Sequence, residues 1–122
     1  MSVNNQERFS FTIMALESGI KYPSLAEAPD EPLLIEMVGI QPEYFGTLST
    51  KFEVDLEDLQ DLLDMDERPR LQLEDKFAML VLRVPIDLNI PGSDRNYSTS
   101  PIGIFTNGRD IIILQHDVIP LR

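Results

Sequence analysis

The sequence predicts an α/β (α+β) fold, in which a mixed β-sheet carries a two-helix layer on one of its faces. Two observations lead to this prediction. Apolar residues alternate with polar ones, or form short apolar runs, in segments at both ends of the chain, which is typical of strands. Between the second and third of these segments, over residues 41–65, apolar residues recur every three or four positions, as on one side of a helix. Strands that flank a helical insertion favour a mixed sheet.

The predicted strands differ in how clearly they alternate. Residues 8–16 place Phe9, Phe11 and Ile13 at every second position. Residues 76–86 are strongly apolar, which is typical of a central strand. The dipeptide Asn107–Gly108 favours a tight hairpin between two further strands. The predicted strands comprise residues 8–16, 33–40, 70–75, 76–86, 97–105 and 110–117. The connections are residues 17–32 and 87–96, and residues 1–7 are expected to be loose.

The two helices are predicted over residues 41–52 and 54–65. In the first, Ile40, Tyr44, Leu48 and Phe52 are four residues apart, and Pro42 is tolerated in the first turn. In the second, Asp55 is a suitable N-cap, and Pro69 cannot continue the helix. The side chains of the second helix expected to face the core are those of Leu56, Leu59, Leu62 and Leu63.

Length and composition exclude several classes of function. The 122 residues suit one domain covering residues 1–122, and the net charge of −11 opposes binding to nucleic acid or to anionic lipids. The absence of cysteine excludes disulfides and thiolate chemistry. The polar start of the chain is unlike a signal peptide, and no apolar run approaches the roughly 20 residues that span a bilayer. The chain is therefore expected to be soluble.

Both faces of the predicted strands at residues 78–84 and 111–114 are apolar. Two helices can cover only one face of a sheet, so the other face is expected to be covered by something else. Either the protein associates, or the sequence is a piece of a longer protein.

Few residues suggest catalysis. His116 has no nucleophile on a G-x-S-x-G turn to act with, so a structural role is expected for it. The sequence contains no phosphate-binding loop, no H-E-x-x-H motif and no EF-hand loop. An enzyme is accordingly the least expected class.

The strongest chemical feature is an acidic segment, residues 53–67. On the predicted helix, Glu57, Asp58, Asp61 and Asp64 fall on the outer flank, and several of them are three or four residues apart. Like charges at that spacing repel by a few tenths of a kcal/mol per pair. A divalent cation would relieve the repulsion, and Mg²⁺ needs only one or two carboxylates because it keeps most of its waters. Spacing alone favours a simple solvated surface over a metal site.

Several motifs together resemble the amino-terminal cytoplasmic domain of CorA-type magnesium and cobalt channels. The family pattern has a strand of the W-I-D-L kind, an L-E-D-x-L stretch, an E-R-P-K/R block and an acidic-aromatic pair that leads into a strand. The matching pieces here are "LIEMVG" (34–39), "LQDLL" (59–63), "ERPR" (67–70) and "EDKFAMLVLRV" (74–84), and "SPIGIFTNGRDIIILQHD" (100–117) is similar to the paired strands that follow. The resemblance covers residues 33–120.

The resemblance implies a regulatory cytoplasmic fragment of a longer membrane transporter, at the cytoplasmic face of the cell membrane, with the sheet between two helical layers. It implies a pentamer that senses Mg²⁺, or Co²⁺ or Zn²⁺, at subunit boundaries. The Asp of L-E-D-x-L corresponds to Asp61, the expected metal ligand, and Asp58 is expected to assist through bound waters. Gln60 replaces the Glu that precedes that Asp in the family, which puts a second metal site in doubt, and Leu34 replaces the strand Trp.

Because the stalk helix that supplies the partner ligand is not in this sequence, metal binding by the fragment alone is expected to be weak. Arg68 and Arg70 are expected to pair with nearby acids. The alternatives are the cytoplasmic domain of a related zinc transporter and a stand-alone acidic protein-interaction domain.

Overall fold

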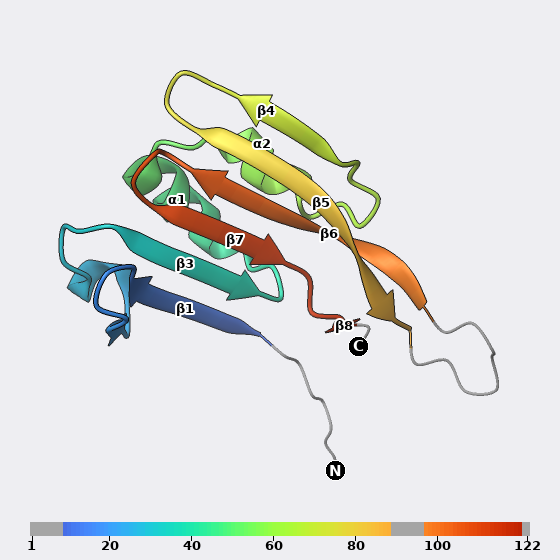
Figure 1. Ribbon diagram of the computed structural model, residues 1–122, viewed down its shortest axis with the longest axis horizontal. Coiled ribbons are helices and arrows are strands. Elements are labelled where there is room, and N and C mark those ends of the chain that lie inside the picture. Colours follow the sequence, from blue (N-terminus) through green and yellow to red (C-terminus); the bar gives the residue numbers. More distant parts are fainter. Residues whose placement is uncertain (1–8, 89–96, 121–122) are drawn as a thin grey trace, which may run out of the picture.

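A twisted β-sheet forms the centre of the molecule, and the helices lie on one of its faces (Figure 1). The computed structural model describes residues 9–88 and 97–120. The strand order is β2-β1-β3-β7-β6-β5-β4, and β8 pairs with the end of β5. The neighbouring strands β3 and β7 are parallel, whereas β1 and β3, β6 and β7, and β5 and β6 are antiparallel. The sheet is therefore mixed and carries both helices on one side, which confirms the predicted fold class.

The predicted strands are present with small shifts at their ends. The strands are β1 (Ser10–Ala15), β2 (Lys21–Tyr22), β3 (Leu33–Val38), β4 (Arg70–Leu73), β5 (Ala78–Asp87), β6 (Tyr97–Thr106), β7 (Ile111–Gln115) and β8 (Ile119–Pro120). The helices are η1 (Leu25–Glu27), η2 (Pro42–Tyr44), α1 (Phe45–Phe52) and α2 (Leu56–Asp61), of which η1 and η2 are 3₁₀ turns. The short elements β2, η1 and β8 were not predicted, because two or three residues are too few to show a period.

The core lies between the sheet and the two α-helices. The pairing registers align Ile13, Ile35, Ile112, Phe105 and Met79 in one row across five strands, and all of these side chains are buried. The side chains that α1, α2 and the turn after α2 pack against this row are those of Phe45, Leu48, Phe52, Leu59 and Leu62. The helical insertion thus covers one face, and burial of apolar area is its main source of stability.

The second helix differs from the prediction. It ends at Asp61, so the helical period does not extend to residue 65. Leu59 and Leu62 are buried as expected, but Leu56 and Leu63 are exposed, and the prediction that these two leucines face the core is wrong. The placement of Asp58 on the outer flank is also wrong, because its side chain is buried against β4. Asp55 does occupy the N-cap position, although its side chain makes no capping hydrogen bond.

The predicted hairpin joins β6 to β7 and also ties three elements together. Gly108 adopts a positive φ of 89°, a conformation that glycine allows at little cost. Asn107 Oδ1 accepts the main-chain N–H of Asp110 at 2.7 Å, and Asn107 Nδ2 donates to the carbonyl of Phe52 at 3.2 Å. Asp110 is buried, and its Oδ1 accepts the N–H of Leu33 at 2.8 Å. The hairpin therefore holds the end of α1 and the start of β3.

The opposite side of the sheet is an apolar surface, here called the open face. Within the described ranges no helix packs over it (Figure 1). Leu71 and Leu73 of β4 are 66% and 73% exposed there. Of the open-face residues named in the next sentence, only Glu36 is charged. Its side chain accepts a hydrogen bond from Gln115. The open face comprises Thr12, Met14, Leu34, Glu36, Val38, Leu71, Leu73, Ala78, Leu80, Leu82, Ile102, Ile104, Thr106, Ile111, Ile113 and Gln115. The expectation that this side is apolar is confirmed.

Two sequence predictions lie outside the described residues. These are the loose amino terminus at residues 1–7 and most of the loop over residues 87–96. In the part of the chain that the structure describes, no helix has both the length and the apolar character needed to cross a bilayer.

Candidate functional site

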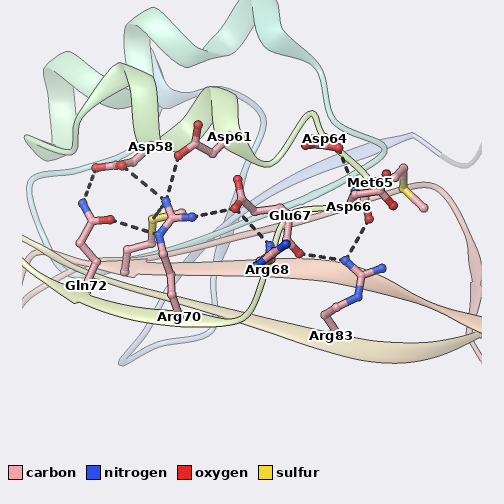
Figure 2. A network of polar contacts seen from close by, with 11 residues as sticks. Asp58, Asp61, Asp64, Met65, Asp66, Glu67, Arg68, Arg70, Gln72 and Arg83 are labelled. Carbon is pink, nitrogen blue, oxygen red and sulfur yellow. Dashed lines mark hydrogen bonds and ion pairs between the residues drawn. The ribbon is translucent and has the colours of Figure 1, made fainter.

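Three carboxylates of the acidic segment lie around a single guanidinium group, that of Arg70 (Figure 2). Arg70 Nη2 donates to Oδ2 of Asp61 at 2.9 Å, and Arg70 Nη1 donates to Oε1 of Glu67 at 2.9 Å. Nη2 also lies 3.6 Å from Oδ1 of Asp58, and Nε donates to Oε1 of Gln72 at 3.2 Å. The expectation of pairing with nearby acids is confirmed for Arg70, whereas the Arg68 side chain forms no ion pair among the described residues. Such charge-assisted bonds are about twice as strong as neutral ones.

The position of Arg70 follows from local geometry. Pro69 cannot continue a helix, and it favours an extended conformation at the residue before it. The strand that follows, β4, pairs Arg70 with Val81 and Gln72 with Met79, both of which are buried beneath the helices. Side chains at alternate strand positions share a face. Arg70 and Gln72 therefore both point from the edge of the sheet towards α2.

Asp58 is the most enclosed carboxylate of the segment. Its side chain is 12% exposed, and its Oδ2 accepts from Nε2 of Gln72 at 2.9 Å. Burial raises the pKa of Asp58 above its usual 3.8; the hydrogen bond from Gln72 opposes this shift, the charge of Asp55 adds to it, and the charge of Arg70 opposes it. The loss of water around this carboxylate thus outweighs its favourable contacts.

A second arginine fixes the turns that follow α2. Arg83 Nη1 donates to the carbonyl oxygens of Met65 and Glu67 at 2.9 and 2.8 Å. Its Nε and Nη2 donate to Oγ1 and the carbonyl oxygen of Thr99, both at 2.8 Å. Arg83 therefore holds the acidic segment against β5 and β6 (Figure 2). Arg68 contributes its main-chain N–H, which donates to Oε1 of Glu67 at 3.1 Å.

The structure brings the two predicted metal ligands together but gives them different surroundings. Asp61 is 44% exposed and uses Oδ2 for Arg70, so the carboxylate also faces solvent. Asp58 lies beneath it, with Gln72 and Arg70 as neighbours. Within the described residues, no three His, Asp or Glu side chains are arranged to hold a metal ion. The described residues thus form no closed metal site, and of the two predicted ligands Asp61 is the one whose carboxylate an ion from solvent can reach.

Sequence reasoning missed two participants, Gln72 and Arg83, and did not identify the contact of Glu67. Glu67 was noted as an acid of the segment, but its contact with Arg70 depends on the turn between α2 and β4. Gln72 lies 14 residues from Asp58, and Arg83 lies 16 residues from Glu67. The sequence did contain a signal for these two residues. Strand alternation places the polar Gln72 and the charged Arg83 on the side of the sheet that faces the helices.

His116 follows β7 and is not among the side chains that Arg70 binds. The main chain of Leu62 provides its hydrogen-bond partner, while its Nε2 is buried and has no hydrogen-bond partner within the part of the chain that the structure describes. Burial lowers the pKa of His116 below its usual 6.5, the hydrogen bond with Leu62 opposes the shift, and the charge of Arg83 adds to it. His116 is therefore neutral near pH 7 and packs as a structural residue.

Comparisons with known proteins give similarity in structure but not in sequence. No protein-family model and no curated protein matches the chain. The soluble domain of CorA from Methanocaldococcus jannaschii superposes with a TM-score of 0.66 at 19% identity, over 89% of this chain and 41% of that one. This chain has the fold of a CorA-type cytoplasmic domain. The ZntB cytoplasmic domain from Vibrio parahaemolyticus RIMD 2210633 superposes with a TM-score of 0.62 at 21% identity, over 93% of this chain and 46% of that one.

The full-length CmaX protein is similar to the same degree, with a TM-score of 0.62 at 19% identity over 94% of this chain and 37% of that one. The chain thus spans less than half the length of each of these structures. Nearly all of this chain takes part in the CorA-type fold, and the matched structures continue beyond it.

Proposed function

We propose that this chain is the cytoplasmic regulatory domain of a CorA-like transporter of divalent metal ions, located at the cytoplasmic face of the cell membrane. The observation that carries the proposal is the superposition of 89–94% of the chain on CorA, CmaX and ZntB structures. A sensing role, without catalysis, is the role proposed for the domain. The membrane segments would belong to other parts of the same protein.

In this proposal Asp61 is the cation ligand. Its carboxylate is 44% exposed at the surface of the acidic segment. One or two carboxylates suffice for Mg²⁺, which retains several waters, so the other ligands would come from a neighbouring copy in a homo-oligomer, proposed to be a pentamer. Asp58, buried beneath Asp61, would assist through bound water and through Arg70. Without the cation, the carboxylate of Asp61 and the acidic groups of the neighbouring subunit would repel one another. This repulsion favours a separated, open arrangement of the subunits.

The ligand chemistry favours Mg²⁺ over Zn²⁺ at this site and does not separate Co²⁺ from Zn²⁺. The polar groups offered by the segment are carboxylate oxygens, which suit Mg²⁺, whereas zinc sites generally include imidazole or thiolate. The chain has no cysteine, and the one interaction shown for its single histidine, His116, other than the charge of Arg83, is a hydrogen bond with the main chain of Leu62. The similarity to a ZntB domain keeps zinc transport as the second candidate function.

The open face supports the idea of a larger protein. Exposed apolar surfaces of this extent mark interfaces, and the described residues provide no cover for it. A further layer packed there would bury Leu71, Leu73 and Leu82, which are exposed in this chain. The third candidate, a stand-alone acidic interaction domain, leaves these leucines in water.

The test is a titration of the full-length protein, as encoded by its gene, with MgCl₂, CoCl₂ or ZnCl₂ under limited proteolysis. Mg²⁺ is expected to protect the wild type, and Asp61→Asn is expected to lose that protection. Glu57→Gln is the matched control, since it removes the same charge from an exposed position of α2 and should keep the protection.

The outcomes separate the candidates. Equal protection of wild type and Asp61→Asn would remove Asp61 from the mechanism. Protection by Zn²⁺ alone would favour the zinc transporter. A gene product without membrane segments, and without protection by any of the three ions, would favour the interaction domain.

A further inference from the structure

We propose that Arg70 is a built-in competitor of the divalent cation for Asp61, so that this arginine sets the cation concentration at which the domain responds. The inference rests on the proposed function, because it concerns the regulation of the same carboxylate. It goes beyond it by assigning a role to a residue that is not itself a metal ligand.

The geometry places the competing positive charge directly on the carboxylate. Nη2 of Arg70 lies 2.9 Å from Oδ2 of Asp61, which is hydrogen-bond distance for a charged pair. A divalent ion bound to the same oxygen would be brought close to the guanidinium, and two positive charges a few ångströms apart repel. Arg70 and a cation therefore compete for Asp61, because a cation on Oδ2 displaces the guanidinium and a cation on Oδ1 is repelled by it.

Asp61 is the partner that Arg70 can release most easily. Its side chain is 44% exposed, whereas those of Asp58 and Glu67 are 12% and 18% exposed. Water and ions therefore reach Asp61 first. Exposed pairs are worth little, because solvent screens them and replaces their hydrogen bonds.

Release of Asp61 does not leave Arg70 without partners. Nη1 keeps its 2.9 Å bond to Glu67, Nε keeps its 3.2 Å bond to Gln72, and the carboxylate of Asp58 lies 3.6 Å from Nη2. The guanidinium can thus stay in place while one carboxylate changes its counterion. This makes the exchange a local event that does not require the segment to unfold.

The strength of the pair gives the size of the effect. A partly exposed ion pair contributes about 1 kcal/mol at most, which corresponds to roughly a fivefold equilibrium constant. A ligand that binds only the released form of Asp61 has its apparent affinity lowered by the same factor. The wild type should therefore bind cations more weakly, by up to about fivefold, than a variant in which nothing holds Asp61.

The test measures Mg²⁺ binding to the full-length protein by isothermal titration calorimetry. Arg70→Gln is expected to bind Mg²⁺ more tightly than the wild type, by up to about fivefold. Arg68→Gln is the matched control, because it removes the same charge two residues away without touching Asp61, and it should change the affinity by less than about twofold through screened charge alone. Asp61→Asn gives the baseline without the proposed ligand.

A second variant keeps the test valid if Arg70→Gln folds poorly. Arg70→Lys preserves the charge but has one ammonium group in place of the forked guanidinium, so it cannot hold Glu67 and Asp61 in the same way. Its affinity should lie between those of wild type and Arg70→Gln.

The two proposals fail in different ways. If Asp61→Asn abolishes binding but Arg70→Gln and Arg70→Lys bind no more tightly than Arg68→Gln, the competition is refuted and the sensing role of Asp61 stands. If Asp61→Asn binds as tightly as wild type, or if no variant binds Mg²⁺, the ligand assignment fails and the competition fails with it.

Discussion

The contact between Gly103 and Leu62 sets how closely the acidic segment approaches the sheet. Gly103 lies in the middle of β6 beneath the buried side chain of Leu62. A Cβ at Gly103 would lie 2.8 Å from Cγ and 2.9 Å from Cδ2 of Leu62, which is a steric clash between carbon atoms. Because the packed core cannot absorb the added methyl, Gly103→Ala should lower the free energy of unfolding by about 1–3 kcal/mol. Leu62→Ala should lower it by about 2–5 kcal/mol.

The double variant distinguishes this contact from a general loss of packing. Alanine at position 62 removes the atoms that clash with the new methyl, so the double variant should lose about 1–2 kcal/mol less than the sum of the single losses. The assay is urea unfolding followed by circular dichroism, with equal m-values required for the comparison.

Additive losses would refute the close approach of Leu62 to the sheet, and with it the placement of the acidic segment. The control is Gly46→Ala. Gly46 lies in α1, and no heavy atom outside its own helix lies within 4 Å of the position of its Cβ. It should therefore raise the free energy of unfolding by about 0.5–1 kcal/mol.

Three further predictions concern buried polar groups. Because the folded state lowers the pKa of His116, the wild type should lose stability relative to His116→Gln as pH falls below 6.5, and urea unfolding from pH 7.5 to 5 measures this. Parallel profiles would contradict a neutral, buried imidazole. The pKa of Asp58 is raised in the folded state, so lowering the pH towards 3.8 should stabilise the wild type relative to Asp58→Asn. Urea unfolding over this pH range measures the difference in stability, and a constant difference would contradict the burial of this carboxylate. Asp110→Ala should cost about 2–3 kcal/mol in thermal or urea unfolding, because the N–H of Leu33 loses a buried charged acceptor; a loss below about 0.5 kcal/mol would show that water replaces it.

The sheet could be predicted from the sequence because its strands are long enough to show a period. Residues 76–86 became the ten-residue strand β5, and the Asn107–Gly108 hairpin formed where the turn chemistry indicated. The helix over residues 54–65 was predicted too long. Its leucines and acids continue the helical spacing past Asp61, but the chain turns there and Arg83 binds the carbonyl oxygens of Met65 and Glu67 instead.

The candidate site could be predicted only in part. The acids and Arg70 were identified from their crowding around Pro69, and their pairing was confirmed. The burial of Asp58 could not be predicted from helical spacing, because it depends on which strand lies beside α2. Its partner, Gln72, belongs to a strand whose register is fixed by pairing with β5, and such long-range contacts leave no local signal.

The charge distribution connects the open face with the acidic segment. The net charge is −11, yet the open face carries one charged residue in the set described above, Glu36. Three acids of the acidic segment lie on the helix side of the sheet, where Arg70 partly neutralises them. Apolar contact on the open face requires no ion, whereas contact between two acidic segments requires neutralisation of their repulsion. Under the proposed function, the open face would stay covered whatever the cation concentration, whereas contact between acidic segments would depend on bound cations.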